Sequence, residues 1–143
     1  MRILCGMFGR ILVAVDGSSQ SSKTVLAAVD LAQKYGATVT VLHVREFERY
    51  EGSDVDLGPP QEAESIIAEV VGRFSEAGVQ AEGEIRRVTP GATPDEIVRA
   101  AEHADADLIV MGTRGMSELR SIVLGGVANK VVHHAHCPVL LVR

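Results

Sequence analysis

The sequence LIVMGTRG, residues 108–115, joins an apolar run to a glycine turn, and Gly125-Gly126 follows after nine more residues. A short apolar run bounded by glycine is typical of a buried strand in a parallel sheet. The second glycine pair precedes a segment with helical periodicity. Because glycine lets main-chain N–H groups approach an anion closely, and a helix N-terminus favours negative charge, this stretch predicts a phosphate-binding turn between a strand and a helix.

The rest of the chain repeats this alternation of strand and helix. The clearest helical stripe runs from Ala63 to Phe74, with apolar residues three and four apart. The expected strands are 10–16, 38–44, 80–88, 108–111 and 139–142. The expected helices run from Ser18 or Ser19 to Gly36, from Ala63 to Gly78, from Thr93 to Ala104, and across Val127, Val131, Val132 and Ala135 on one face. The pattern predicts an α/β fold: a doubly wound, five-stranded parallel sheet of Rossmann-like order 3-2-1-4-5, with helices on both faces.

Local signals set the ends of several elements. Thr93 is a suitable cap, Pro94 fits the first helical position, and Glu96 completes a capping box. Strand 80–88 is more polar than the others, which favours a place near an edge of the sheet. These signals predict a sharp helix start at Thr93.

The segment Arg45–Pro60 is expected to be a loop. It contains two glycines, two prolines and alternating acidic residues, which we interpret as a solvated face. Loops longer than about 12–15 residues are usually functional or disordered. Because this one leaves the sheet edge at which a ligand would bind, we hypothesise that it forms a flap over the site.

Composition and charge exclude several classes of protein. A net charge of −5 and only 3% aromatic residues argue against a nucleic-acid binder. The chain has no apolar run near the ~20 residues that span a membrane and no signal peptide. Cys5 and Cys137 form no disulfide framework. We expect a soluble cytoplasmic protein with a single domain over residues 1–143, in which residues 1–8 are a ragged N-terminal extension and either Met1 or Met7 is the start.

Two features are expected to face each other across the sheet. In the predicted strand order, Asp16 at the end of the first strand lies opposite Gly112 at the end of the fourth, where ligands bind in such sheets. The carboxylate can accept hydrogen bonds from a ribose or a base, and it can equally hold the turn before the first helix. Arg114, and less firmly Arg120, add positive charge beside the glycines.

A metal site is the weaker interpretation of the histidines near the C-terminus. His133 and His134 point to different sides of a helix, and no second cluster completes a ligand set with His136 and Cys137. We therefore expect no metal ligands there and a small apolar role for Cys137. His43 lies in a core strand, which favours a structural role.

The motif Gly112-x2-Gly115-x9-Gly125 resembles the G-x2-G-x9-G-(S/T) signature of the universal stress protein family, in its ATP-binding subgroup. The opening strand with Asp16, the pair His43-Val44 and the closing sequence CPVLLV, residues 137–142, also resemble the family, so the likeness covers Gly9–Arg143. The resemblance implies binding of ATP, with AMP or ADP as alternatives and Mg²⁺ as an accompanying ion. It also implies a homodimer through the C-terminal strand, residues 138–143, an apolar edge that would otherwise be exposed.

The family's nucleotide contacts carry over onto matching positions. The adenine contacts fall on Ala14, Val15, Asp16 and Val44, and the ribose and phosphate contacts fall on Met111, Gly112, Arg114, Gly115, Gly125, Gly126 and Val127. One position departs from the pattern, because Gly126 stands where the family usually has Ser or Thr. The lost hydroxyl donor is worth roughly 0.5–3 kcal/mol, so weaker ATP binding is expected.

The resemblance implies a dimeric, nucleotide-responsive stress or signalling protein rather than a committed enzyme. The chain has no Walker lysine motif, and Glu118 is the one acid near the glycine turn, so at most slow ATP hydrolysis is expected, and no catalytic residue is assigned. Two alternatives stay open. The first is a slow ATPase or nucleotidyl-transfer relative that uses Asp16 or Glu118, and the second is an interaction module that binds no nucleotide.

Overall fold

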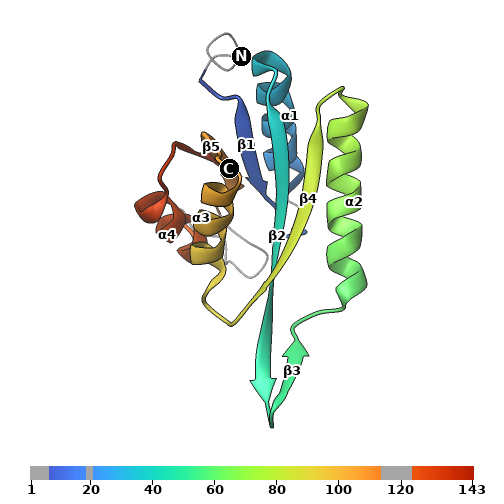
Figure 1. The fold of residues 1–143 in the computed structure, drawn as a ribbon, viewed down its shortest axis with the longest axis vertical. Coiled ribbons are helices and arrows are strands. Elements are labelled where there is room, and N and C mark those ends of the chain that lie inside the picture. The colour runs from blue at the N-terminus through green and yellow to red at the C-terminus, as the bar shows by residue number, and fades with distance from the viewer. Residues whose placement is uncertain (1–6, 19–20, 114–123) are drawn as a thin grey trace.

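The computed structural model describes residues 7–18, 21–113 and 124–143 (Figure 1). In chain order the elements are β1 (Arg10–Ala14), α1 (Ser21–Tyr35), β2 (Thr38–Tyr50), β3 (Ser53–Asp56), α2 (Pro60–Glu76), β4 (Ala81–Val88), α3 (Thr93–His103), β5 (Leu108–Gly112), α4 (Gly126–His134) and β6 (Val139–Val142). The predicted alternation of strand and helix is confirmed.

The central sheet contains five parallel strands in the order β4-β2-β1-β5-β6. Counted among these five alone, the order is the predicted 3-2-1-4-5. The polar strand β4 lies at one edge, as expected, and β6 lies at the other. The strand order reverses between β1 and β5, so the carboxyl ends of these two strands border the crevice where ligands bind in such sheets.

Two apolar clusters fill the space between the sheet and the helices. One cluster joins inward-facing strand residues such as Val13 and Val41 to α1 and α2, with Phe74 fully buried at its centre. The other joins Leu12 and Leu42 to α3 and α4 through Ile97 and Val131. Alternate residues of each strand therefore serve opposite layers, as a sheet covered on both faces requires.

The prediction of a loop over Arg45–Pro60 is wrong. Strand β2 continues to Tyr50, and β3 returns antiparallel beside it, so that Tyr50 pairs with Ser53. Both residues of the turn between them have positive φ, 48° at Glu51 and 80° at Gly52, as a two-residue hairpin of type I′ requires. Figure 1 shows this hairpin extending beyond the rest of the sheet as an arm.

Two acidic residues of the arm form ion pairs, whereas Glu48 and Glu51 are exposed, as a solvated face predicts. Asp54 pairs with Arg49 at 3.1 Å, and Asp56 pairs with Arg87 at 2.7 Å and with Arg45 at 3.5 Å. The Arg87 guanidinium also lies 4.6 Å from the centre of the Phe47 ring, a favourable cation–π distance. These contacts fasten the arm to strand β4.

The start of α3 also differs from the expected capping box. The cap position is Ala92, and the Thr93 hydroxyl donates to Glu46 on β2 at 3.0 Å. The Glu96 carboxylate is buried and accepts from Arg86 at 2.8 Å and from Arg99 at 2.6 Å. Burial lowers the pKa of Arg86, but its hydrogen bonds to Glu96 and Glu84 outweigh this and raise it overall. The ion pair fixes the first turn of α3 against β4.

Smaller differences concern both ends of the chain. Val132 was expected on the buried face of α4, but it is exposed because it lies about 100° around the helix from buried Val131. Phe8 was assigned to a ragged extension, yet its ring packs edge-on against Tyr35 with centroids 5.3 Å apart. Among the described residues, none of the helices has the length and apolar character needed to cross a membrane.

Candidate functional site

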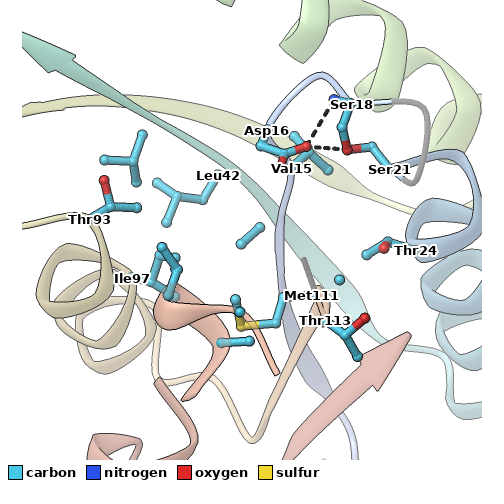
Figure 2. Close-up of a pocket in the computed structure, with 16 residues that line it drawn as sticks. Val15, Asp16, Ser18, Ser21, Thr24, Leu42, Thr93, Ile97, Met111 and Thr113 are labelled. Atoms are coloured by element: carbon cyan, nitrogen blue, oxygen red, sulfur yellow. Dashed lines mark hydrogen bonds between the residues drawn. The ribbon is translucent and has the colours of Figure 1, made fainter. Parts of the chain in front are cut away.

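A pocket opens at the carboxyl ends of β1 and β5 and beside Leu42 and Val44 in the middle of β2 (Figure 2). The N-terminal turns of α1, α3 and α4 border it. Its empty volume is about 750 Å³, which includes space open to solvent. The location is the crevice that the strand order predicts.

Most of the residues predicted for the site lie together in this pocket. Gly126 begins α4 outside the lining, and Arg114 and Gly115 lie outside the described residues, as do Glu118 and Arg120. The predicted residues that line the pocket are Ala14, Val15, Asp16, Val44, Met111, Gly112, Gly125 and Val127.

Two groups of pocket-lining residues were not predicted from the sequence. One group carries hydroxyls, on Ser18, Ser21 and Thr24 around the start of α1 and on Thr113 after β5. The other group comes largely from α3, where Thr93 and Ile97 face the pocket. The start of α3 lies beside the middle of β2, where the Thr93 hydroxyl donates to Glu46. The expected strand 38–44 ends near this point, and that is the signal that could have predicted the second group.

Asp16 holds the turn that leads into α1. Its Oδ1 atom accepts a hydrogen bond from the Ser18 main-chain N–H at 2.9 Å and another from the Ser21 hydroxyl at 3.0 Å. The turn-holding role considered for this residue is therefore present. Among the described residues no hydrogen bond to the second carboxylate oxygen is found, so Oδ2 keeps its acceptor capacity at the pocket wall.

The main chain before Asp16 is fixed by β2. The Val15 N–H donates to the Leu42 carbonyl at 2.9 Å, and the Val15 carbonyl lies 2.8 Å from Nδ1 of His43. His43 thus has the structural role that its core position favours. With both main-chain groups of Val15 bonded to β2, the position of Asp16 is set by the sheet rather than by a free loop.

The N-terminus of α4 supplies the donor groups on the opposite side. The first bond inside this helix runs from the Asn129 N–H to the Gly125 carbonyl at 2.9 Å, so the N–H groups of Gly126, Val127 and Ala128 precede it. No side chain caps the helix at Gly125. Two neighbouring amides have other partners, because Thr113 donates to the Val142 carbonyl and Gly125 donates to the Thr113 carbonyl. Among the described residues, the start of α4 is therefore an anion-binding position on the β5 side of the pocket.

An apolar wall completes the pocket. Leu42, Ile97 and Met111 are all at least 95% buried, yet each contributes surface to the pocket. In Figure 2, Ile97 lies on the side away from Asp16, Ser18 and Ser21, and Leu42 lies between. The pocket is therefore polar at the α1 end and apolar between β2 and α3.

The described residues contain no group of three His, Cys, Asp or Glu side chains placed to hold a metal ion. His133 bonds within its own helix, with Nδ1 2.8 Å from the Asn129 carbonyl. Burial, helped by the negative charge of Asp107, raises the pKa of the Cys137 thiol. Cys137 is therefore protonated at neutral pH and packs as a small apolar group against the α3–α4 cluster.

Comparison with known proteins gives a consistent result. The model of the universal stress protein family matches residues 7–143. The Thermus aquaticus protein called universal stress protein in QAH/OAS sulfhydrylase 3′region is 37% identical over 147 residues, covering 96% of this chain and 100% of its own length. Universal stress protein YxiE of Bacillus subtilis is 35% identical over 151 residues, covering 96% of this chain and 100% of its own length.

Solved structures agree with the sequence relatives. The universal stress protein from Archaeoglobus fulgidus in complex with dAMP has a TM-score of 0.71 and 25% identity, covering 96% of this chain and 99% of that one. A universal stress protein in complex with cAMP has a TM-score of 0.72 and 25% identity, and the match covers 96% of this chain and 98% of that one. With the family model matched over nearly the whole chain and the same fold in these structures, the chain belongs to the universal stress protein family.

Proposed function

We propose that this protein binds ATP, or another adenine nucleotide, in the pocket between β1 and β5 and acts as a dimeric, nucleotide-responsive stress or signalling protein. The observation that carries the proposal is the division of the pocket. It has an apolar wall, a carboxylate with acceptor capacity, and helix amides without an intrahelical acceptor on the opposite side. A base, a ribose and a chain of phosphates need these three environments.

The charges favour one orientation of the nucleotide. Phosphates are repelled by Asp16 and attracted by the N-terminus of α4, where Val127 and Ala128 line the pocket. The base then fits the apolar wall between Leu42 and Ile97, and Asp16 accepts from a sugar or base donor. The complexes of two relatives with dAMP and cAMP support an adenine nucleotide as the ligand class.

Isothermal titration calorimetry tests the proposal. Protein freed of nucleotide is titrated with ATP, AMP and cAMP, with and without Mg²⁺. Saturable binding of one nucleotide per chain supports the proposal and ranks the ligands. Absence of heat with all three nucleotides, at protein concentrations that detect a Kd of 1 mM, contradicts it.

Replacing Gly126 by Ser is expected to tighten ATP binding about three- to tenfold, because it adds a hydroxyl donor beside the amides of α4. A Cβ built at Gly126 meets nothing within 4 Å, so the side chain fits without moving its neighbours. Gly126→Ala is the matched control, since it adds the Cβ without the hydroxyl. Calorimetry that finds equal affinity for the Ser and Ala variants would contradict this prediction.

The free edge of β6 supports the proposed homodimer. Among the described strands, β6 pairs with β5 alone, and Leu140 is 38% exposed. We expect Leu140→Glu to convert a dimer into a monomer, because it places a charge in an apolar contact. Val55→Glu, on the distant arm, is the control and should stay dimeric. Sedimentation of wild-type protein as a monomer at micromolar concentration would rule the dimer out.

A further inference from the structure

Strand β4 leaves one edge of the central sheet open. Among the described strands, β4 pairs with β2 alone. The Val39 N–H donates to the Gln80 carbonyl at 2.9 Å, so the main-chain groups of Gln80 and of every second residue after it face β2. The main-chain groups of Gly83, Ile85 and Arg87 therefore face away from the sheet, as a row of donors and acceptors that a further strand can use.

The charges along β4 are separated by sign. Glu82 and Glu84 occupy its first half, and Arg86 and Arg87 occupy its second half. Two parallel copies of such a strand place like charges side by side. Two antiparallel copies place the acidic half of each beside the basic half of the other. The edge is therefore complementary to itself in one direction, which favours a second copy of this chain over an unrelated strand.

Ile85 sets the register of such a pair. It is a large apolar residue and yet is 39% exposed. When Ile85 lies opposite its own copy, the two residues exchange both main-chain hydrogen bonds, and Glu84 of each chain lies opposite Arg86 of the other. A shift of two residues in either direction places Glu84 opposite Glu84 or Arg86 opposite Arg86. A shift of one residue brings side chains of opposite faces together.

Both faces of the sheet leave room for a second copy beside β4. On one face, a Cβ added at Gly83 would collide with Ile67, so α2 packs directly over the strand (Figure 1). Ala68 and Gly72 lie next around this side of the helix, and a Cβ added at Gly72 meets nothing within 4 Å. Such small residues let a second helix approach closely. On the other face, the acidic half of β4 lines an open groove.

We propose that a second copy of this chain pairs with the free edge of β4, antiparallel and with Ile85 on the two-fold axis. The two sheets then join into one, and the α2 helices of the two copies lie side by side. This contact is separate from the proposed dimer through β6, which lies at the opposite edge of the sheet, and it does not depend on nucleotide. Because one strand and one side of a helix make a small interface, we expect a Kd of about 0.1–1 mM.

Sedimentation equilibrium of the Leu140→Glu variant tests this contact, because that substitution removes the proposed β6 dimer. We expect this variant to be monomeric at micromolar concentration and to dimerise as its concentration approaches about 1 mM. Adding Ile85→Lys should weaken the association at least about tenfold, because it places two like charges on the two-fold axis. Val55→Lys, which changes an exposed apolar residue on the arm, is the matched control and should leave the association unchanged.

Hydrogen exchange in the Leu140→Glu variant gives a second readout that needs no substitution in β4. The amides of Gly83, Ile85 and Arg87 should exchange more slowly at high than at micromolar protein concentration, whereas the amide of Glu84, which faces β2, should not change.

Three results would overturn the inference and leave the edge to solvent or to a strand of another protein. The first is a Leu140→Glu variant that stays monomeric at the highest concentration. The second is an association that Ile85→Lys leaves intact or that Val55→Lys weakens equally. The third is an association that does not slow exchange at Gly83, Ile85 and Arg87.

Discussion

Replacing Ala14 by Phe is expected to weaken ATP binding at least about 100-fold, or roughly 2.7 kcal/mol. Ala14 is the last residue of β1, is only partly buried, and lines the pocket beside Val15 and Asp16. A phenyl ring there takes up space that the nucleotide needs. Because Ala14 also packs against the α3–α4 apolar cluster, circular dichroism and thermal melting must show that the variant is folded. Calorimetry with ATP measures the effect.

Thr38→Phe is the matched control for this variant. Thr38 is exposed on β2, the strand next to β1, and its register partner is Arg10 at the other end of β1. It therefore adds the same ring to the neighbouring strand, away from the proposed site. We expect ATP affinity within about twofold of wild type for Thr38→Phe. Equal loss of affinity in both variants, or none in Ala14→Phe, would refute the assignment of the pocket.

Phe74→Ala is expected to lower the free energy of unfolding by about 3–5 kcal/mol, the usual cost of removing a core phenylalanine and leaving a cavity. Phe74 is fully buried on α2 and is among the largest side chains with no exposed surface. It packs with Val70 and Val79 against the strands of the first apolar cluster. Chemical denaturation followed by circular dichroism measures the change from the shift in midpoint.

The same substitution at Phe47 provides the comparison. Phe47 is only partly buried on the arm, and its ring is partnered by Arg87. Phe47→Ala should cost about 1 kcal/mol, from lost cation–π contact and partial burial. Equal costs at Phe47 and Phe74 would mean that the α1–α2 layer is not packed as described.

Most of the sheet could be predicted because its strands carry a strong signal. Continuous apolar runs such as residues 108–111 mark strands buried on both faces, and each is separated from the next by a helix with a clear stripe. The hairpin was missed because its turn is Glu51-Gly52, without the Asn-Gly or Asp-Gly pair that usually marks a type I′ turn. Asp56 forms ion pairs with Arg45 on β2 and Arg87 on β4, which are distant from it in the sequence. Because composition does not show such partners, the prediction placed Asp56 on a solvated face.

The site residues at strand ends could be predicted from the sequence. The site residues that depend on tertiary contacts could not. Asp16 follows β1 and Gly112 ends β5, and the two strands are adjacent and parallel, so topology brings them together. The choice of Ala92 over Thr93 as the cap of α3 depends on the hydrogen bond to Glu46, a partner on another strand. Likewise, nothing local marks Ser18, Ser21 and Thr24 as lining residues, because that depends on how α1 lies against the ends of β1 and β5. Such residues are found only from the folded structure.

A crystal structure of the protein grown with excess ATP tests the central claim most directly. We predict the base against the apolar wall of Leu42 and Ile97, Asp16 bonded to a donor of the sugar or base, and the phosphates at the main-chain amides that begin α4. A crevice that stays empty at saturating ATP, or a nucleotide bound elsewhere on the molecule, would contradict the account and leave only the fold and the family.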